Sequence, residues 1–318
     1  NMELNITTLK FKIMALEKLY LPEHPGSTFR GAFGGSLRKL TCSIDDTECE
    51  KCNLNNNCPY SLFFNPFLTE KDKKRTSKRF HNKLRPFIFI TNSNYKKMYS
   101  PGEELTFKIR IFGDMKEFLP YVIESWKRLG KIGLGSSRAN FLLKNVWIEN
   151  DLRGITKKIY DYKEKEIKNE DTAINIKDVK EEKKYFNNKI TLLFKTPTLL
   201  KVKGSFVKKG LKFNLLMRTL FRRLSTLAAF YGEELDIDFG KHLNKANKIQ
   251  IAKENLEWEK WYRYSNGQNK KITMKGIIGA VSYQGDLNDF LNYLILAQYI
   301  NLGKNTVFGQ GYYEILNY

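Results

Sequence analysis

The sequence contains no uninterrupted apolar stretch of the roughly 18 residues that a membrane-spanning helix needs. Residues 2–21 alternate like a β-strand and lack the basic, apolar and small-residue order of a secretory signal peptide. These two absences argue against a membrane-embedded or secreted protein. We therefore expect a soluble protein of the cytoplasm that has no membrane partner.

Acidic residues are too few to balance the basic ones, since 34 Asp and Glu face 55 Lys and Arg and give a formal net charge of +21. An excess of this size usually indicates a polyanionic partner, with nucleic acid ahead of an acidic membrane surface. A general bias of the source proteome toward lysine is the alternative explanation. The charge therefore favours a nucleic-acid-binding protein.

Cysteine is absent outside one short stretch, which holds Cys42, Cys49, Cys52 and Cys58. Two disulfides could be drawn among them, but a reducing cytosol argues against both. The Cys49-x-x-Cys52 pair, with a further cysteine on each side, favours a tetrahedral thiolate site for zinc, and an iron–sulfur cluster is the alternative. Four thiolate ligands leave no open position for water, so we expect a structural zinc that staples this loop.

The chain has 318 residues, enough for two domains that each bury a core. Hydrophobic periodicity predicts the order β, α, β, β, α, β in residues 1–150 and again in residues 185–318. Residues 151–184 balance ten basic side chains against nine acidic ones and are interpreted as a charged connector. The repeated order predicts an α+β protein in which a ferredoxin-like unit is duplicated, with the cysteine loop inserted in the first copy.

The predicted elements have the following bounds. Strands are expected at 4–21, 86–91, 104–112, 140–148, 188–200, 248–253, 256–264, 271–283 and 312–316. Helices are expected at 28–40, 115–129 and 211–231, and after a cap at Asp286.

Two glycine-rich turns share the opening Leu-Gly-Lys, at Leu129–Arg138 and at Leu302–Gly311, each between a predicted helix and a predicted strand. Backbone N–H groups in such turns can approach a phosphodiester chain closely, although a tight connection is the alternative use. The candidate contacts to nucleic acid in these turns are Lys131, Arg138, Gly303, Lys304, Gly309, Gln310 and Gly311.

The first predicted helix places Arg30, Gly34 and Arg38 four residues apart on one face. Two guanidinium groups beside a bare glycine form a candidate seat for a phosphate, and two solvated arginines are the alternative. Each interior glycine costs a helix about 1 kcal/mol relative to alanine. We therefore expect something to approach this helix closely, either packed backbone or a ligand.

At this point the sequence resembles the CRISPR repeat-processing endoribonuclease family of the RAMP superfamily, whose members consist of tandem ferredoxin-like, RRM-like domains. The resemblance rests on Thr28–Gly34, on the cysteine cluster leading into Cys58–Tyr60, on Trp261–Ser265 and on Phe308–Gly311. It covers nearly the whole chain and is weakest over residues 151–184.

The resemblance implies an enzyme that binds and cuts the repeat of a precursor CRISPR RNA without a catalytic metal. The ribose 2′-hydroxyl upstream of the cut would attack its own phosphate and leave a 2′,3′-cyclic phosphate. Such a reaction needs a base, an acid and positive charge at the phosphate.

The resemblance places the chemistry at or near the first helix, often with a histidine, and this helix contains none. His24, just before the helix, is the first candidate for general acid or base, and an ordinary turn residue is the alternative. His242 is a second candidate, and His81 in a basic loop is more typical of a bystander. Without a histidine, orientation and charge stabilisation would fall to Tyr20, Arg30, Arg38 and Lys39.

Two other functions fit the same sequence. The missing helix histidine favours a non-catalytic RNA-binding subunit of a CRISPR interference complex, whose partners would include other effector subunits. A zinc-stapled DNA-binding protein is the more distant alternative, and the sequence shows no recognition helix of the usual kind.

Overall fold

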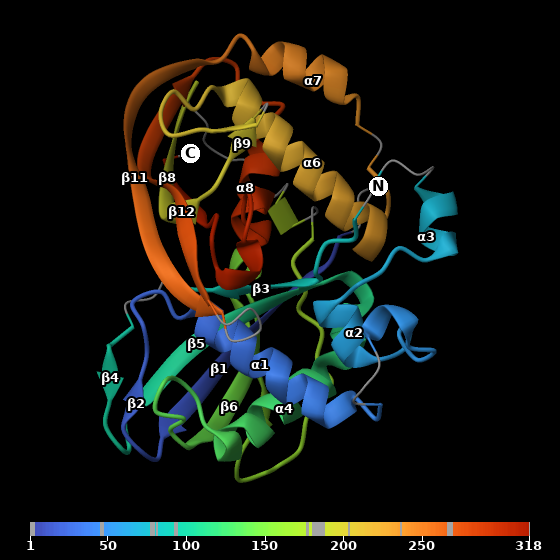
Figure 1. Ribbon diagram of the computed structural model, residues 1–318. Helices are drawn as coiled ribbons and strands as arrows, with labels where there is room; N and C mark the ends of the chain where they lie inside the picture. Colours follow the sequence, from blue (N-terminus) through green and yellow to red (C-terminus); the bar gives the residue numbers. More distant parts are fainter. Residues whose placement is uncertain are drawn as a thin grey trace. The chain divides into compact units, whose positions relative to one another are not determined.

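The computed structural model describes residues 4–44, 48–76, 80, 82–91, 95–175, 178–179, 188–202, 204–235, 237–265 and 270–317. The chain divides into two compact units, shown in Figure 1. The first contains Asn1–Asn175 and Thr226–Glu234, and the second contains Ile176–Ser225 and Leu235–Tyr318. No helix in the described part of the chain is both long and apolar enough to span a bilayer.

The first unit consists of a five-stranded sheet with helices on one face. Its strands are β1 (Ile6–Ala15), β2 (Leu19–Tyr20), β3 (Phe87–Ile90), β4 (Met98–Tyr99), β5 (Glu104–Phe112), β6 (Phe141–Asn150) and β7 (Ile155–Asp161). Its helices are α1 (Gly26–Thr41), α2 (Pro59–Phe64), α3 (Glu70–Arg75) and α4 (Leu119–Ile132). The sheet order is β3-β5-β1-β6-β7 with every neighbour antiparallel, while β2 and β4 pair separately.

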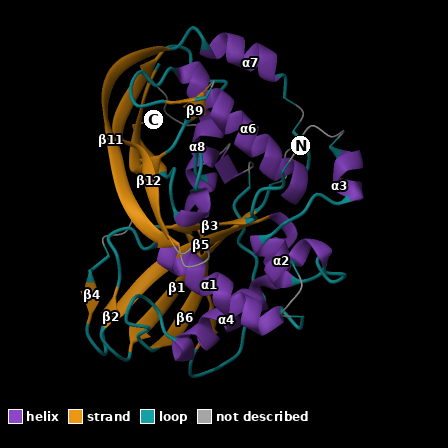
Figure 2. Cartoon of the chain, in the orientation of Figure 1, coloured by secondary structure: helices purple, strands orange, loops and turns teal. Residues whose placement is uncertain are grey.

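α1 and α4 lie against the first sheet (Figure 2), and aromatic side chains hold them there. Phe29 and Phe33 of α1 are fully buried, four residues apart on one face of the helix. The ring of Trp126 from α4 lies 4.4 Å from that of Phe107 on β5, and Phe29 stacks on Phe107 at 4.9 Å. Burying one such side chain contributes about 1.5–3 kcal/mol, so this cluster fixes α1 firmly on the sheet.

The second unit contains a four-stranded antiparallel sheet of order β11-β12-β8-β13. Its strands are β8 (Lys189–Thr198), β9 (Lys201–Val202), β10 (Ser205–Phe206), β11 (Gln250–Ser265), β12 (Lys270–Gln284) and β13 (Tyr313–Asn317). Its helices are α6 (Phe213–Tyr231), α7 (Phe239–Ala246) and α8 (Leu291–Ile300), and the residues of α6 from Thr226 onward belong to the first unit. In both sheets the first strand lies between the third and the fourth, and the second lies beyond the third. β7 adds a fifth strand at the edge of the first sheet.

α6 and α8 lie against the second sheet (Figure 2), and buried side chains join them to it. Leu216, Leu220 and Leu224 form the predicted apolar stripe of α6 and are fully buried. The Tyr313 hydroxyl on β13 donates to the Leu294 carbonyl of α8 at 2.5 Å, and the Tyr283 hydroxyl on β12 donates to the Leu211 carbonyl at 2.7 Å. Both phenols are buried, so these hydrogen bonds satisfy polar groups that would otherwise destabilise the core.

Several bounds differ from those that the sequence predicts. Residues 248–253 and 256–264 form the single strand β11, with an irregularity between Ile251 and Lys253. Pro25, not Ser27 or Thr28, precedes the first residue of α1. Asp286 accepts hydrogen bonds from Asn288 in a turn, and α8 begins only at Leu291.

The boundary predicted at residue 150 lies inside the first unit, which runs to Asn175. The reason is β7, which pairs with β6 as a fifth strand, and a bridge between Ile6 and Ile174 that holds the following segment on β1. The predicted connector thus contributes its first part to a sheet. Its residues 176, 177 and 180–184 lie outside the described residues.

Candidate nucleic-acid interface

The three glycines in the interior of α1 divide into a covered one and two open ones. A Cβ added to Gly34 would lie 2.7 Å from Cε1 of Phe64, so this glycine lets α2 pack closely on α1. A Cβ on Gly31 or Gly35 would meet no atom within 4 Å. The predicted bare seat at Gly34 is therefore occupied by an aromatic ring, and the open positions lie three residues before it and one residue after it.

The two arginines of α1 rest on aromatic rings of α2. The guanidinium carbon of Arg30 lies 5.2 Å from the centroid of the Phe64 ring, and that of Arg38 lies 5.7 Å from the Tyr60 ring. The two rings stack on each other with centroids 5.3 Å apart and planes 12° apart. Cation–π contacts of this kind orient a guanidinium group without neutralising its charge.

Phe64 did not figure among the residues singled out in the sequence, and Tyr60 figured only in the family resemblance, not as a partner of Arg38. Their signal is the Pro59–Phe64 run, where proline suits the first turn of a helix and two aromatic residues follow four apart.

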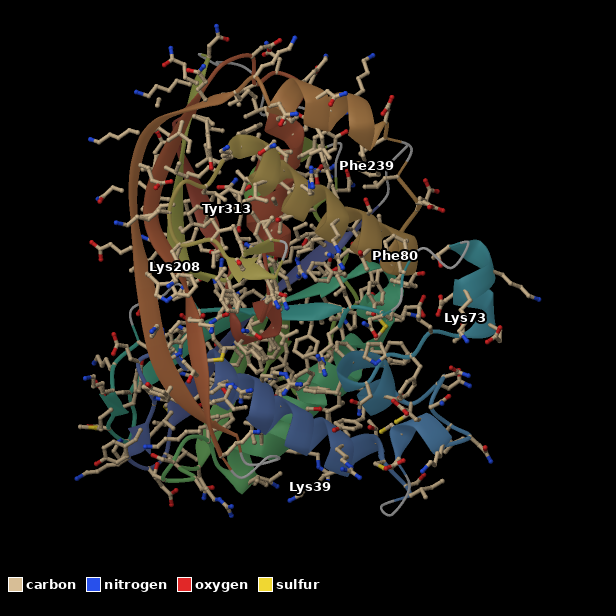
Figure 3. The ribbon with its side chains drawn as sticks, turned by 45° about the horizontal axis from the view of Figure 1, so that its top comes forward. Lys39, Lys73, Phe80, Lys208, Phe239 and Tyr313 are labelled. Atoms are coloured by element: carbon tan, nitrogen blue, oxygen red, sulfur yellow. The ribbon has the colours of Figure 1, made fainter. Side chains whose placement is uncertain are left out.

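Cys42 supports the charge of Arg38. Desolvation acts to lower the pKa of Arg38, but a hydrogen bond to Cys42 and the attraction of Tyr60 and Cys49 outweigh it, so the pKa is raised. Arg38 and Lys39 are both exposed at the C-terminal end of α1, where Lys39 is labelled in Figure 3. This end of the helix therefore presents positive charge to solvent.

The first glycine turn packs against the strand that carries Tyr20. A Cβ on Gly135 would lie 2.3 Å from the Tyr20 carbonyl oxygen, and Gly135 has φ +79°. The Ser137 hydroxyl donates to the Lys18 carbonyl at 3.0 Å. The side chains of Tyr20, Lys131 and Arg138 are exposed, with Tyr20 at 46%. The structure thus brings three predicted site residues, from β2 and from the turn, to one part of the first unit's surface.

The closing glycine turn is bound to β8 through its backbone. Lys304 N–H donates to the Leu199 carbonyl at 3.0 Å, and Gly311 N–H donates to the Pro197 carbonyl at 3.1 Å. A Cβ on Gly303 would lie 2.5 Å from the Leu199 oxygen. These glycines allow backbones to meet within the protein, which is the tight-connection alternative.

Of the predicted contacts in the closing turn, only the Lys304 side chain is exposed. Gly309 and Gly311 are buried, Gly303 is half-buried, and Gln310 is 2% exposed. The Gln310 carbonyl accepts a hydrogen bond from the Asn301 amide at 2.9 Å. The buried Gln310 side chain therefore cannot contact a ligand directly in this conformation.

The candidate catalytic residues do not form one cluster. His24 is half-buried in the turn before α1, whereas Lys39 lies 13 residues beyond Gly26, the first residue of the helix. At 1.5 Å per residue this separation is roughly 20 Å along the axis, too far for both to reach one phosphate.

The structure describes the surroundings of only one of the two other histidines. The His242 ring lies 5.8 Å from Phe221, 6.0 Å from Tyr293 and 6.2 Å from Phe290, so it packs in an aromatic cluster on α7 instead of a polar stretch. His81 lies outside the described residues.

The four cysteines are half-buried and free of disulfides. Within the described ranges, no three of the Cys, His, Asp and Glu side chains converge in a way that could hold a metal ion. The Cys42 thiol instead donates to the Ile44 carbonyl at 3.3 Å. As placed, the thiols do not form the predicted tetrahedral site, and residues 45–47 between them lie outside the described part.

Two family models match the chain, one in each half. Residues 4–172 match the domain family AF_1859_N, described as an N-terminal domain. Residues 192–313 match the family of the CRISPR-associated endoribonuclease Cas6. An uncharacterized protein of Archaeoglobus fulgidus is 25% identical over 317 residues, which are 98% of this chain and 98% of that protein.

Solved structures share the fold at low sequence identity. Thermus thermophilus Cas6 gives a TM-score of 0.56 at 12% identity, over 99% of this chain and 100% of that chain. A Cas6 product complex gives 0.56 at 12% identity, over 98% and 99%. A chain of a partial Cas6-RT-Cas1–Cas2 complex gives 0.57 at 13% identity, over 98% of this chain and 46% of that chain.

Residues 192–313 thus match the Cas6 endoribonuclease family, and the chain as a whole shares the mixed α and β fold of solved Cas6 structures. These matches confirm the resemblance to the CRISPR repeat-processing family seen in the sequence.

Proposed function

We propose that this protein is an endoribonuclease that binds and cleaves CRISPR repeat RNA in precursor transcripts, without a catalytic metal ion. The observation that carries the proposal is the match of residues 192–313 to the Cas6 endoribonuclease family. The formal charge of +21 fits a polyanionic substrate. The exposed cations Lys131, Arg138, Lys304, Arg38 and Lys39 supply candidate phosphate contacts.

Cleavage would proceed by attack of a ribose 2′-hydroxyl on the adjacent phosphate, giving a 2′,3′-cyclic phosphate and a 5′-hydroxyl. His24 is our candidate for proton transfer, because it lies in the turn directly before α1, where the resemblance places the chemistry. Tyr20 and Arg138, which lie near one turn, would orient the RNA and stabilise charge on the phosphate.

We assign both units to the ferredoxin-like fold. The support is the strand order, since four strands of each sheet lie in the order fourth, first, third, second, with a helix after the first strand and after the third. An internal duplication accounts for this repetition without sequence identity between the units.

A structural zinc at Cys42, Cys49, Cys52 and Cys58 remains a proposal that rests on the ligand chemistry and spacing alone. We expect purified protein to hold zinc at an equimolar ratio, and Cys49→Ser to lower the thermal midpoint more than it lowers activity of the folded protein. Elemental analysis and calorimetry measure both. Zinc-free protein with an unchanged midpoint in the variant would contradict the proposal.

The test of the activity is incubation of purified protein with end-labelled repeat RNA in EDTA. We expect one discrete cut, absent when the nucleotide upstream of the cut carries a 2′-deoxyribose. A His24→Ala variant should cut more slowly while binding the RNA normally. No cleavage by wild-type protein that binds the repeat tightly would contradict the enzyme.

Tight binding of the repeat without cleavage would favour a non-catalytic RNA-binding subunit of a CRISPR effector complex. The observation in its favour is α1 itself, which contains no histidine. Such a protein would retain the repeat RNA uncut and bind other effector subunits.

A further inference from the structure

Three lysines gather around two aromatic rings on the second unit, and none of the five residues belongs to a glycine turn. Lys275 Nζ lies 4.1 Å from the centroid of the Phe206 ring, and Lys201 Nζ lies 5.9 Å from it. Lys208 Nζ lies 5.7 Å from the Trp258 ring, and the two rings are 6.2 Å apart. We call these five residues the lysine–aromatic cluster; Lys208 is labelled in Figure 3.

The cluster is assembled by two hairpins of the second unit. The short β9–β10 hairpin and the residues after it carry Lys201, Phe206 and Lys208. The long β11–β12 hairpin carries Trp258 and Lys275. Because two paired strands support each half, the positions of these side chains are fixed by backbone hydrogen bonds.

The lysines of the cluster have no carboxylate partner in the described part of the chain. The first unit provides a contrast, since Lys10 and Lys108 both pair with Glu149, at 2.6 Å and 2.5 Å. Lys12 and Lys144 likewise share Glu104. The positive charge of the cluster is therefore left for a partner, whereas that of the first sheet is largely neutralised.

A fourth lysine adds to this charge. Lys260 lies directly opposite Lys275 in the β11–β12 register, so both side chains share one face of the sheet. Like charges at such positions destabilise a sheet. An anion bound between them would reverse that effect.

Trp258 supplies a hydrogen-bond donor in the same place. Its indole Nε1 is buried and has no acceptor among the described residues. A buried donor without a partner costs roughly 1–3 kcal/mol. An oxygen atom of a bound molecule would satisfy it.

We propose that the lysine–aromatic cluster binds a single-stranded segment of the RNA substrate, with the lysines on successive phosphates and the Trp258 indole N–H on a phosphate or base oxygen. Basic side chains interleaved with aromatic rings are how proteins hold single strands without a fixed sequence. The inference rests on the proposed function for the identity of the polyanion. It adds a binding site that neither glycine turn contains.

The decisive variant is Lys201→Gln/Lys208→Gln/Lys275→Gln. Its matched control, Lys195→Gln/Lys248→Gln/Lys253→Gln, removes the same charge from exposed lysines of the same unit. Binding of labelled repeat RNA with its single-stranded flanks is followed by fluorescence polarisation across a salt series. The plot of log K against log salt has a negative slope. Each lost phosphate contact reduces the magnitude of that slope by about 0.7 for a single strand.

We expect the cluster variant to reduce the magnitude of the slope by about 2 and to weaken the affinity on the order of tenfold or more. The control variant should change neither quantity. Equal slopes and affinities for the two triple variants would overturn the inference. Failure of the wild-type protein to bind the RNA at all would instead overturn the proposed function.

Trp258→Phe keeps a ring and removes the N–H donor. We expect it to weaken binding about threefold to tenfold and to leave the salt slope unchanged, because no charge is removed. Unchanged affinity would remove the indole from the site. A repeat hairpin without flanks should bind both triple variants equally, and a persisting difference would contradict the single-stranded assignment.

Discussion

The two glycine turns open with the same three residues, yet the structure uses them differently. In the first, Gly135 lies against the Tyr20 carbonyl, while Ser136, Ser137 and Arg138 stay exposed. In the second, the backbone from Gly309 to Gly311 is buried and bound to β8. The first turn therefore presents a surface, and the second mainly ties a strand to its neighbour.

This difference shows what a glycine motif does and does not reveal. At both turns glycine is needed because a protein backbone comes too close for a Cβ, at a positive φ that other residues avoid. Contact with RNA is then left to the few cations that leave the turn. Which of them are exposed depends on how deeply each turn is packed, and the motif does not encode that depth.

The largest effect is expected for Gly311→Ala. A Cβ there would lie 1.9 Å from the Leu302 oxygen at φ +82°, whereas Gly204, at φ +87°, has nothing within 4 Å. The left-handed conformation costs both variants about 1–2 kcal/mol, and the clash adds a further 1–3 kcal/mol at Gly311. Unfolding of both variants followed by circular dichroism measures the difference. If Gly311→Ala and Gly204→Ala lost the same stability, the closing turn could move to accommodate the added Cβ.

A smaller effect is expected for Gly135→Ala in the first turn. Its Cβ would lie 2.3 Å from the Tyr20 oxygen at φ +79°, and Gly102, at φ +88° with open space around it, is the control in the same unit. Because residues 136–138 are exposed, the turn can shift, and we expect about 1–2 kcal/mol beyond the control. The shift should also slow RNA cleavage by moving Tyr20. An unaltered cleavage rate in the folded variant would separate Tyr20 from the chemistry.

Most of the fold could be predicted from the sequence, because long periodic segments such as β5 and α6 carry their own signal. Several short elements escaped, among them α2, α3, the β9–β10 hairpin and α7, and the last two show the physical reasons. The β9–β10 hairpin is too short to show periodicity, and α7 is largely polar with one buried residue, Ala246. The lysine–aromatic cluster depends on that hairpin, so no spacing within the sequence could reveal it.

The candidate site was predicted less completely than the fold. The sequence located the cations of the turns, but it could not show that Phe64 covers Gly34 or that Gln310 is buried. Both facts depend on contacts between segments far apart in the chain. Residues chosen for their type therefore need the packing before they can be assigned to a surface.

The smallest effects, and the most direct test of the comparison, are expected from Arg138→Ala and Lys304→Ala. Each removes one exposed cation, so each should weaken repeat-RNA binding and lower the salt slope by about 0.7. Lys163→Ala and Lys253→Ala remove exposed lysines elsewhere in the first and second units and serve as controls. Gln310→Ala should leave the slope almost unchanged, because its side chain is buried and uncharged. If the salt slope becomes shallower for Arg138→Ala but not for Lys304→Ala, only the first turn contacts the RNA. Lys304 would then extend into solvent without reaching a phosphate.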